Sequence, residues 1–120
     1  MDINVSTIQK RNNLNEIHRV GNAGPGGACH EYVIRNRETA ECLGVVLFQK
    51  GPRGQEGSIS GVLDGDLLEI VRDRLRAFQD GEFACRENAI ALTHVEEALL
   101  WMARRADERA ERGVLGTDKV

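Results

Sequence analysis

The joint between two predicted helices reads Phe78-Gln-Asp-Gly-Glu-Phe-Ala-Cys-Arg-Glu-Asn88. Upstream of it, Asp66 with Glu69 three residues later is typical of a capping box and starts a helix that should run to about Gln79. Gly81 is well placed just past the C-cap of that helix. Because the joint is short, the stretch predicts an α-helical hairpin.

The second predicted helix runs from about Ala84 to Arg112 and stops at Gly113. Mostly apolar side chains line up along one face of this helix and form a stripe that should pack on the first helix. The stripe consists of Asn88, Leu92, Val95, Leu99, Met102 and Ala106. Ile90 and Trp101 widen the apolar arc beyond what one partner helix can cover. A second subunit with Trp101 as its anchor would explain the excess, and packing of Trp101 on the chain's own sheet is the alternative.

Two strands are predicted ahead of the helical hairpin. Residues 30–35 are rich in β-forming side chains, and residues 42–49 are nearly all apolar, so the second strand should be central or covered on both faces. Residues 36–39 form a turn that predicts an antiparallel pairing, and residues 58–60 could add a short third strand.

The first twenty residues carry a weak helical pattern of apolar side chains, interrupted at Asn12 and Asn13. We therefore expect an α+β fold in which a small antiparallel β-sheet is followed by a C-terminal helical hairpin, assembled as an oligomer. One domain should span residues 1–120, with a variable N-terminal helix and linker in 1–28, antiparallel strands in 29–62 and the hairpin in 63–120.

Composition limits the classes of function. The chain has 120 residues and a net charge of −3, which argues against a general DNA or RNA binder with a broad basic face. Three cysteines without C-x-x-C spacing predict neither a disulfide framework nor a structural zinc site, so we expect no metal and no cofactor. The start of the chain does not resemble a signal peptide, and no apolar run is long enough to span a bilayer, so we expect no membrane partner.

The hinge and the end of the second helix carry side chains that suit a base joined to phosphates. Phe78 could stack on a heterocycle and the Asn88 amide could read a base edge, although Phe78 could equally be core and Asn88 could satisfy a backbone group. Arg105 and Arg109 repel each other at i,i+4 spacing, and an anion would relieve that repulsion. The alternative is a pair of solvated surface arginines. With no recognisable nucleophile, general base or metal set, the residues favour a binder of a nucleotide-like anion over an enzyme.

The chain resembles the phage Thoeris anti-defence sponge family. The resemblance is carried by the run from Asp66 to Trp101, above all by Phe83-Ala-Cys-Arg-Glu-Asn-Ala, and by residues 109–117. Residues 46–52 and 57–61 also match, so the similarity covers roughly the last two-thirds of the chain. The first 28 residues match nothing in that family.

The resemblance implies sequestration without catalysis. Members of the family bind cyclic ADP-ribose isomers made by bacterial Toll/interleukin-receptor domains, and some also take cyclic oligonucleotides at a separate pocket. Such proteins assemble as dimers or as hexamers built from dimers. Carried over by position, Phe78 and Asn88 would hold the adenine, Arg105 and Arg109 the pyrophosphate, and Arg53 would be added from the facing subunit.

The resemblance also implies action in the cytoplasm of the infected bacterial host, where the immune signal is made. It leaves open which cyclic isomer is preferred. The alternative function is a protein-binding inhibitor that docks its helical hairpin on a host defence factor. Arg105 and Arg109 discriminate between the two functions, because a purely protein-binding role does not need them as an unpaired set.

Overall fold

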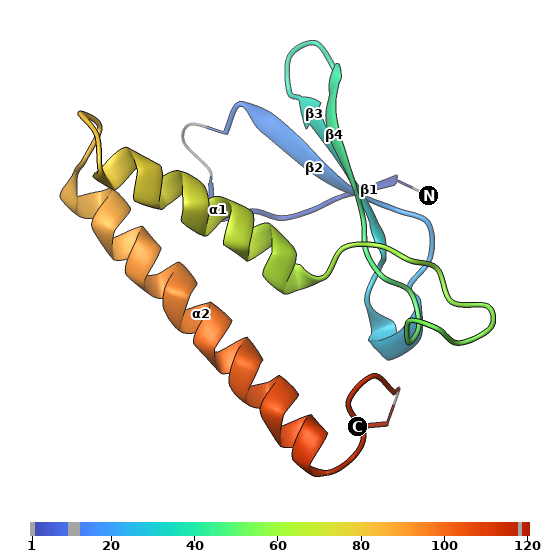
Figure 1. The fold of residues 1–120 in the computed structure, drawn as a ribbon. Helices are drawn as coiled ribbons and strands as arrows, with labels where there is room; N and C mark the ends of the chain where they lie inside the picture. The colour runs from blue at the N-terminus through green and yellow to red at the C-terminus, as the bar shows by residue number, and fades with distance from the viewer. Residues whose placement is uncertain (1, 10–12, 118) are drawn as a thin grey trace. The chain divides into compact units, whose positions relative to one another are not determined.

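The computed structural model describes residues 2–9, 13–117 and 119–120, and it divides the chain into two compact units (Figure 1). Met1–Val62 forms the sheet unit and Leu63–Val120 forms the hairpin unit. The sheet unit holds one four-stranded antiparallel sheet, and the hairpin unit holds two helices. The predicted α+β fold class is confirmed. That the two units form one domain stays a prediction.

The sheet has the strand order β1-β2-β3-β4, and every neighbouring pair is antiparallel. Its strands are β1 (Asp2–Asn4), β2 (Asn15–Val20), β3 (Glu31–Asn36) and β4 (Cys42–Leu47), and a short 3-10 turn, η1 (Pro25–Gly27), precedes β3. Val33 in the middle of β3 pairs with His18 on one side and Val45 on the other, and it is the one buried apolar residue among those described. The predicted pairing of the two strands around the turn at residues 36–39 is confirmed.

The N-terminal helix predicted in residues 1–28 is wrong for the described part of that segment. Strands β1 and β2 occupy it instead, and Ile17 of β2 lies opposite Ile34 of β3. Two β-branched side chains that face each other on neighbouring strands stabilise the sheet. The pairing with Ile34, which is distant in the sequence, therefore outweighs the weak helical spacing of the apolar residues. Asn12, where the pattern breaks, lies outside the described residues.

The predicted place of β4 is also wrong. Residues 42–47 form an edge strand, and Leu43, Val45 and Leu47 are about half exposed on it. The segment after the turn covers only the end of this edge, through single bridges from Phe48 to Val62 and from Lys50 to Ile59. Residues 58–60 therefore contribute one bridge and no strand of their own. The apolar run of β4 reflects side chains that the isolated sheet unit does not bury.

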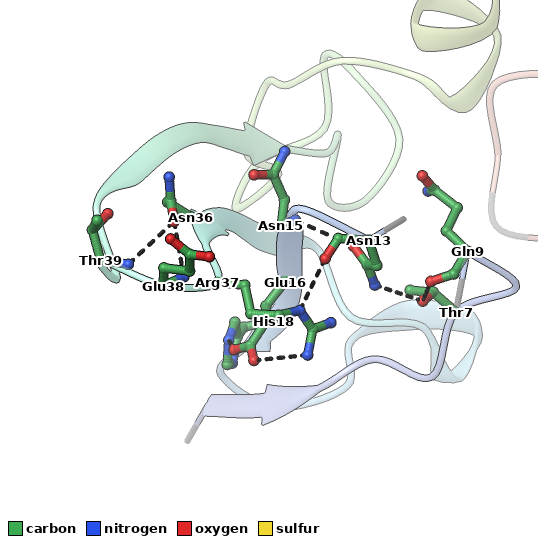
Figure 2. Close-up of polar contacts among 10 residues, drawn as sticks. All are labelled: Thr7, Gln9, Asn13, Asn15, Glu16, His18, Asn36, Arg37, Glu38 and Thr39. Atoms are coloured by element: carbon green, nitrogen blue, oxygen red, sulfur yellow. Dashed lines mark hydrogen bonds and ion pairs between the residues drawn. The ribbon is translucent and has the colours of Figure 1, made fainter. Parts of the chain in front are cut away.

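A polar network holds the segment before β2 against the β3–β4 turn (Figure 2). The Arg37 guanidinium lies 3.5 Å from Glu16 Oε1 and donates from Nε to the Asn13 carbonyl at 3.1 Å. Glu16 Oε2 in turn lies 3.1 Å from His18 Nε2. Neighbouring backbone N–H groups of the turn donate to the Asn36 side chain. These bonds give the strand ends defined partners, which explains the ordered turn.

The hairpin unit contains α1 (Asp64–Gln79) and α2 (Arg86–Glu111), which run antiparallel on either side of a short loop (Figure 1). Helix α1 begins two residues earlier than predicted, and the Asp66 carboxylate accepts from the Leu63 backbone N–H at 2.8 Å. Helix α2 begins after Cys85, whose sulfur accepts from the Asn88 backbone N–H at 3.4 Å. Both predicted helices are confirmed within two residues at each end.

One ion pair joins the two helices of the hairpin. Arg72 Nε donates to Glu96 Oε2 at 2.8 Å, and Glu69 lies 3.6 Å from the same guanidinium. The hydrogen bond to Glu96 raises the pKa of Arg72, and the loss of hydration opposes this rise, while the charges of Glu96 and Glu69 add to it. The pair therefore links the middle of α1 to the middle of α2.

Apolar side chains of the hairpin are far from fully buried. The predicted stripe residues Leu92, Val95 and Leu99 are half-buried, but Trp101 is 67% exposed and Leu100 is 70% exposed. Among the described residues, neither helix is both long and apolar enough to cross a membrane.

The close approach of Gly61 to β4 gives a test of the sheet unit. A Cβ on Gly61 would lie 2.5 Å from the Leu47 carbonyl oxygen and 2.5 Å from the Phe48 carbonyl carbon, so the 59–62 segment would have to move away from the sheet. We expect Gly61→Ala to lower the free energy of unfolding by about 1–3 kcal/mol. Urea titration monitored by circular dichroism measures the change.

Gly44→Ala is the matched control, because a Cβ on Gly44 meets nothing within 4 Å. This variant should keep or slightly raise stability, since alanine restricts the unfolded chain. Equal unfolding midpoints for the two variants would show that the 59–62 segment does not lie against β4 as described.

Candidate functional site

The predicted site residues of the hairpin unit fall at its two ends. Phe78 lies in the last turn of α1 and Asn88 in the first turn of α2, so both belong to the loop end. Arg105 and Arg109 lie in the last two turns of α2. Asn88 and Arg105 are 17 residues apart on one continuous helix, which separates them by about 25 Å at 1.5 Å per residue. The structure therefore brings the four residues together in two pairs and not in one cluster.

Phe78 at the loop end is half-buried and belongs to an aromatic pair. Its ring lies 6.3 Å from that of Phe83, with 74° between the planes. The Arg74 guanidinium lies over the Phe78 ring, 5.4 Å from its centroid. Phe83 and Arg74 are not among the residues predicted for the site. The spacing of Arg74 four residues before Phe78 on one helix face was the available signal for the contact.

The sequence left two roles open for the Asn88 amide, and its contacts do not support the first, which is to satisfy a backbone group at the hinge. Its backbone N–H is capped by the Cys85 sulfur, so the side-chain amide is not needed for that bond. Among the described residues the amide has no hydrogen-bond partner, although the residue is half-buried. An amide in this setting has free donor and acceptor capacity for an incoming group.

Arg109 has partners, and the expectation that it is unpaired is wrong. It is only 7% exposed. Its Nη1 donates to the Lys119 carbonyl at 2.6 Å, and Nη2 donates to the carbonyls of Val114 and Thr117 at 3.1 and 3.0 Å. The side chain therefore holds the C-terminal segment against the end of α2. Sequence reasoning missed this contact because the acceptors are backbone carbonyls, which every residue type carries.

The hydrogen bonds of Arg109 also limit what else it can bind. A guanidinium forms bidentate pairs along two edges, one with Nε and Nη2 and one with Nη1 and Nη2. Both hydrogens of Nη2 are directed to the carbonyls of Val114 and Thr117, so neither edge is complete for a phosphate. Arg105 differs, because it is exposed and forms no ion pair with any described residue. Arg105 is the arginine of the pair that is free to take an anion.

Arg53 lies in the sheet unit and braces a turn. Its Nε donates to the Gln49 side chain at 3.1 Å and its Nη2 to the Gly61 carbonyl at 3.0 Å. Gln49 also accepts from the Gly61 backbone N–H, so the three groups tie residues 49–61 together. The residue is exposed, and its Nη1 group has no partner among the described residues.

The sheet unit also contains a small cavity that involves none of the predicted site residues. It measures about 220 Å³, and its lining combines polar side chains, among them His30, Glu31 and Lys50, with apolar ones such as Phe48. That volume is below the usual range for a drug-sized ligand, so the cavity does not suit a whole nucleotide. Within residues 2–9, 13–117 and 119–120, no group of three or more His, Cys, Asp or Glu residues could hold a metal ion.

Comparisons with known proteins identify a family. The family model described as "Acb2/Tad1, hairpin domain" matches residues 44–107, which is 64 of the 120 residues and more than half of the chain. The matched range includes four of the five predicted site residues and ends two residues before Arg109. The protein named "Thoeris anti-defense 1" from Bacillus phage SBSphiJ7 is 45% identical to this chain over 94 residues. The alignment covers 78% of this chain and spans 64% of the length of that relative.

The contacts of Arg109 yield a stability prediction. Arg109→Ala leaves three carbonyls of the C-terminal segment without their donor, so the free energy of unfolding of the hairpin unit should fall by about 1–3 kcal/mol. Hydrogen exchange at the Val114 and Thr117 amides, which are both hydrogen-bonded in the folded protein, should accelerate. Arg109→Lys should behave similarly, because a lysine cannot present a planar fork.

Arg105→Ala serves as the control, one helical turn away. Its side chain is exposed, so stability should stay within about 0.5 kcal/mol of wild type and exchange in the C-terminal segment should not change. If the Arg105 and Arg109 variants exchange at the same rate as wild type, the C-terminal segment is not held by Arg109.

Proposed function

This chain belongs to the Acb2/Tad1 hairpin-domain family, and on that premise we propose that it is a phage anti-defence protein that sequesters a cyclic ADP-ribose-type immune signal. The name of its phage relative supports the anti-defence role. The observation that carries the choice of ligand is the loop end of the hairpin. That end of the hairpin carries the aromatic pair of Phe78 and Phe83 and, in the first turn of α2, the half-buried Asn88 amide, which has no partner among the described residues.

The loop end supplies what an adenine base requires. The Phe78 ring offers an apolar face for stacking, and a base stacks on an aromatic side chain regardless of its hydrogen-bonding edge. The Asn88 amide offers one donor group and one acceptor, which match the N7 and amino group of adenine. Phe78 and Asn88 are the residues that we propose to bind the base.

The far end of α2 supplies the charge for the pyrophosphate. Arg105 is exposed, and we propose that it forms the first charge-assisted contact with the ligand. Arg109 can add a bidentate contact only after the Val114 and Thr117 carbonyls release its Nη2 group. Phosphate oxygens carry more charge than carbonyl oxygens, so they compete well for that group. We propose that Arg53 of the facing subunit, whose Nη1 group has no partner among the described residues, is added to this set.

The length of α2 requires that the two ends of the site come from different chains. A cyclic nucleotide with one base and one pyrophosphate cannot bridge the roughly 25 Å between Asn88 and Arg105. Two copies with antiparallel α2 helices place the loop end of each beside the arginine end of the other. A two-fold axis then generates two equal sites per dimer.

The exposed apolar face of α2 supports this pairing. Trp101 is 67% exposed, and Arg105 lies one turn beyond it on the same side of the helix. If Trp101 anchors the contact with the second copy, Arg105 borders that contact and faces the partner. Assembly of dimers into a hexamer, and a further pocket for cyclic oligonucleotides, are compatible with this arrangement.

Sequestration requires tight binding and no chemistry. A site closed between two chains excludes water, which strengthens hydrogen bonds between guanidinium groups and phosphates. We propose that the protein is not an enzyme, that it needs no cofactor, and that it acts in the cytoplasm of the infected host.

A protein-binding inhibitor is the second candidate, because an exposed Trp101 also suits a partner protein. Arg109 no longer discriminates between the two, which leaves Arg105 and the ligand itself to do so.

Binding of the ligand by variants tests the proposal. Calorimetry with a panel of cyclic ADP-ribose isomers should show binding of at least one isomer by wild type, and the ligand should be recovered intact after heat denaturation. Phe78→Ala should lose about 1–3 kcal/mol of binding free energy, and Asn88→Ala and Arg105→Ala should each weaken binding at least tenfold. Arg76→Ala, an exposed arginine elsewhere on α1, is the control.

The outcome for Phe78→Ala must be read beside its melting temperature, because the ring is half-buried. Folded Phe78→Ala and Asn88→Ala variants that bind as tightly as wild type would place the site elsewhere. Absence of binding across the whole panel would instead favour the protein-binding inhibitor.

The state of assembly is a separate test. Light scattering should give at least twice the 13.3 kDa chain mass at micromolar concentration. Trp101→Lys should shift the mass toward one chain, because a charge in the centre of an apolar contact is costly. A wild-type protein that stays monomeric in the presence of ligand contradicts the shared site.

A further inference from the structure

The loop between the helices presents an aromatic ring that packing of the hairpin does not explain. Phe83 is 69% exposed. The loop around it is nevertheless well hydrogen-bonded, because the Cys85 N–H donates to the Gln79 side chain at 3.0 Å and the Ala84 N–H to the Gly81 carbonyl at 3.3 Å. An ordered loop that keeps a phenylalanine in water forgoes the free energy of burying it. The ring therefore occupies a fixed place and remains available to another molecule.

Two side chains, Phe83 and Arg74, lie next to the Phe78 ring. The Phe83 ring stands nearly perpendicular to Phe78, with 74° between the planes and 6.3 Å between the centroids. The Arg74 guanidinium lies over one face of Phe78 at 5.4 Å. Phe78 is half-buried, and the exposed Arg74 side chain lies over one face of its ring. Arg74 forms no ion pair with any described residue and has no carboxylate to hold it there.

We propose that Arg74 and Phe83 complete the base-binding site, with Phe78 as the floor, Phe83 as the end wall and Arg74 as the opposite face of a slot for a planar base. This inference rests on the proposed function and adds two specificity-determining residues to it. A base in contact with both Phe78 and Arg74 needs about 7 Å between them, twice the usual contact distance of about 3.5 Å. Arg74 must therefore move outward by roughly 1.5 Å, which a rotamer adjustment of a long side chain supplies.

When a base enters the proposed slot, new contacts with the base replace the contact between Arg74 and Phe78. In the free protein the guanidinium interacts with the Phe78 ring, and with ligand bound it interacts with the base. Phe83 replaces water at the edge of the base with an aromatic face. A ligand without a planar base keeps its contacts with the arginines of α2 but gains nothing from Phe83 or Arg74.

Two substitutions separate this role from a structural one. Phe83→Leu keeps an apolar side chain and removes the ring, and Arg74→Ala removes the guanidinium. With the cyclic ADP-ribose isomer that wild type binds most tightly, calorimetry should show at least ~5-fold weaker binding for Phe83→Leu. Arg74→Ala should weaken binding about threefold. Phe83→Tyr should retain wild-type affinity, and Arg76→Ala on the same helix should change it less than twofold.

A spectroscopic measurement identifies the cause of these losses. In proton NMR the adenine H2 and H8 signals of the bound ligand should shift upfield under the ring currents of Phe78 and Phe83, and the shift should be smaller for Phe83→Leu. Melting temperatures should match wild type, since Phe83 is exposed. If a variant melts lower, recovery of both affinity and the NMR shift by Phe83→Tyr still supports the slot.

The outcomes separate this inference from the proposed function. If wild type binds the ligand and both Phe83→Leu and Arg74→Ala bind it equally well with an unchanged NMR shift, the slot is wrong and the proposed function stands. If wild type binds no member of the panel, the proposed function itself fails.

Discussion

The length of one uninterrupted helix is the constraint on which the proposed site depends. Helix α2 (Arg86–Glu111) carries the Asn88 amide in its first turn and two arginines in its last turns, and its fixed rise keeps Asn88 about 25 Å from the nearer arginine, Arg105. No side-chain movement closes such a gap. A ligand that needs both ends must find them on two chains. In this account the exposed Trp101 and the half-exposed stripe of α2 are the contact surface that the site requires.

The C-terminal end of α2 has a structural task in addition to the proposed one. Arg109 is the one buried charged side chain among the described residues, and it satisfies three backbone carbonyls beyond the helix. The burial of this guanidinium costs less free energy because the three carbonyls accept its hydrogen bonds. Under the proposed function, the ligand competes with the protein's own backbone for this side chain. Arg105 has no such contacts with the described residues, so we propose it as the more direct phosphate ligand.

The hairpin could be predicted from the sequence because its signals are local. The Asp66 carboxylate near the start of α1, the glycines after each helix and the apolar stripe of α2 are each visible within a few residues. The place of β2 could not be predicted in this way, because it depends on the pairing of Ile17 with Ile34 far along the chain. The prediction that β4 would be central or covered on both faces was wrong for a related reason. An apolar run in the sequence does not show which element, if any, covers it. Only part of the proposed slot could be predicted from the sequence. Phe78 was identified from its place at the hinge, but the position of the Phe83 ring depends on how the loop folds.

Complementation between two defective chains tests the shared site most directly. Asn88→Ala lacks the base end and Arg105→Ala lacks the phosphate end, so each homodimer should bind ligand weakly at both sites. A mixed dimer, isolated through two different affinity tags after co-expression, carries one doubly substituted site and one site with both native residues. A shared site predicts one ligand per mixed dimer at wild-type affinity, against two per wild-type dimer. A mixed dimer that binds no more tightly than either homodimer would contradict it, because both ends of the site would then belong to the same chain.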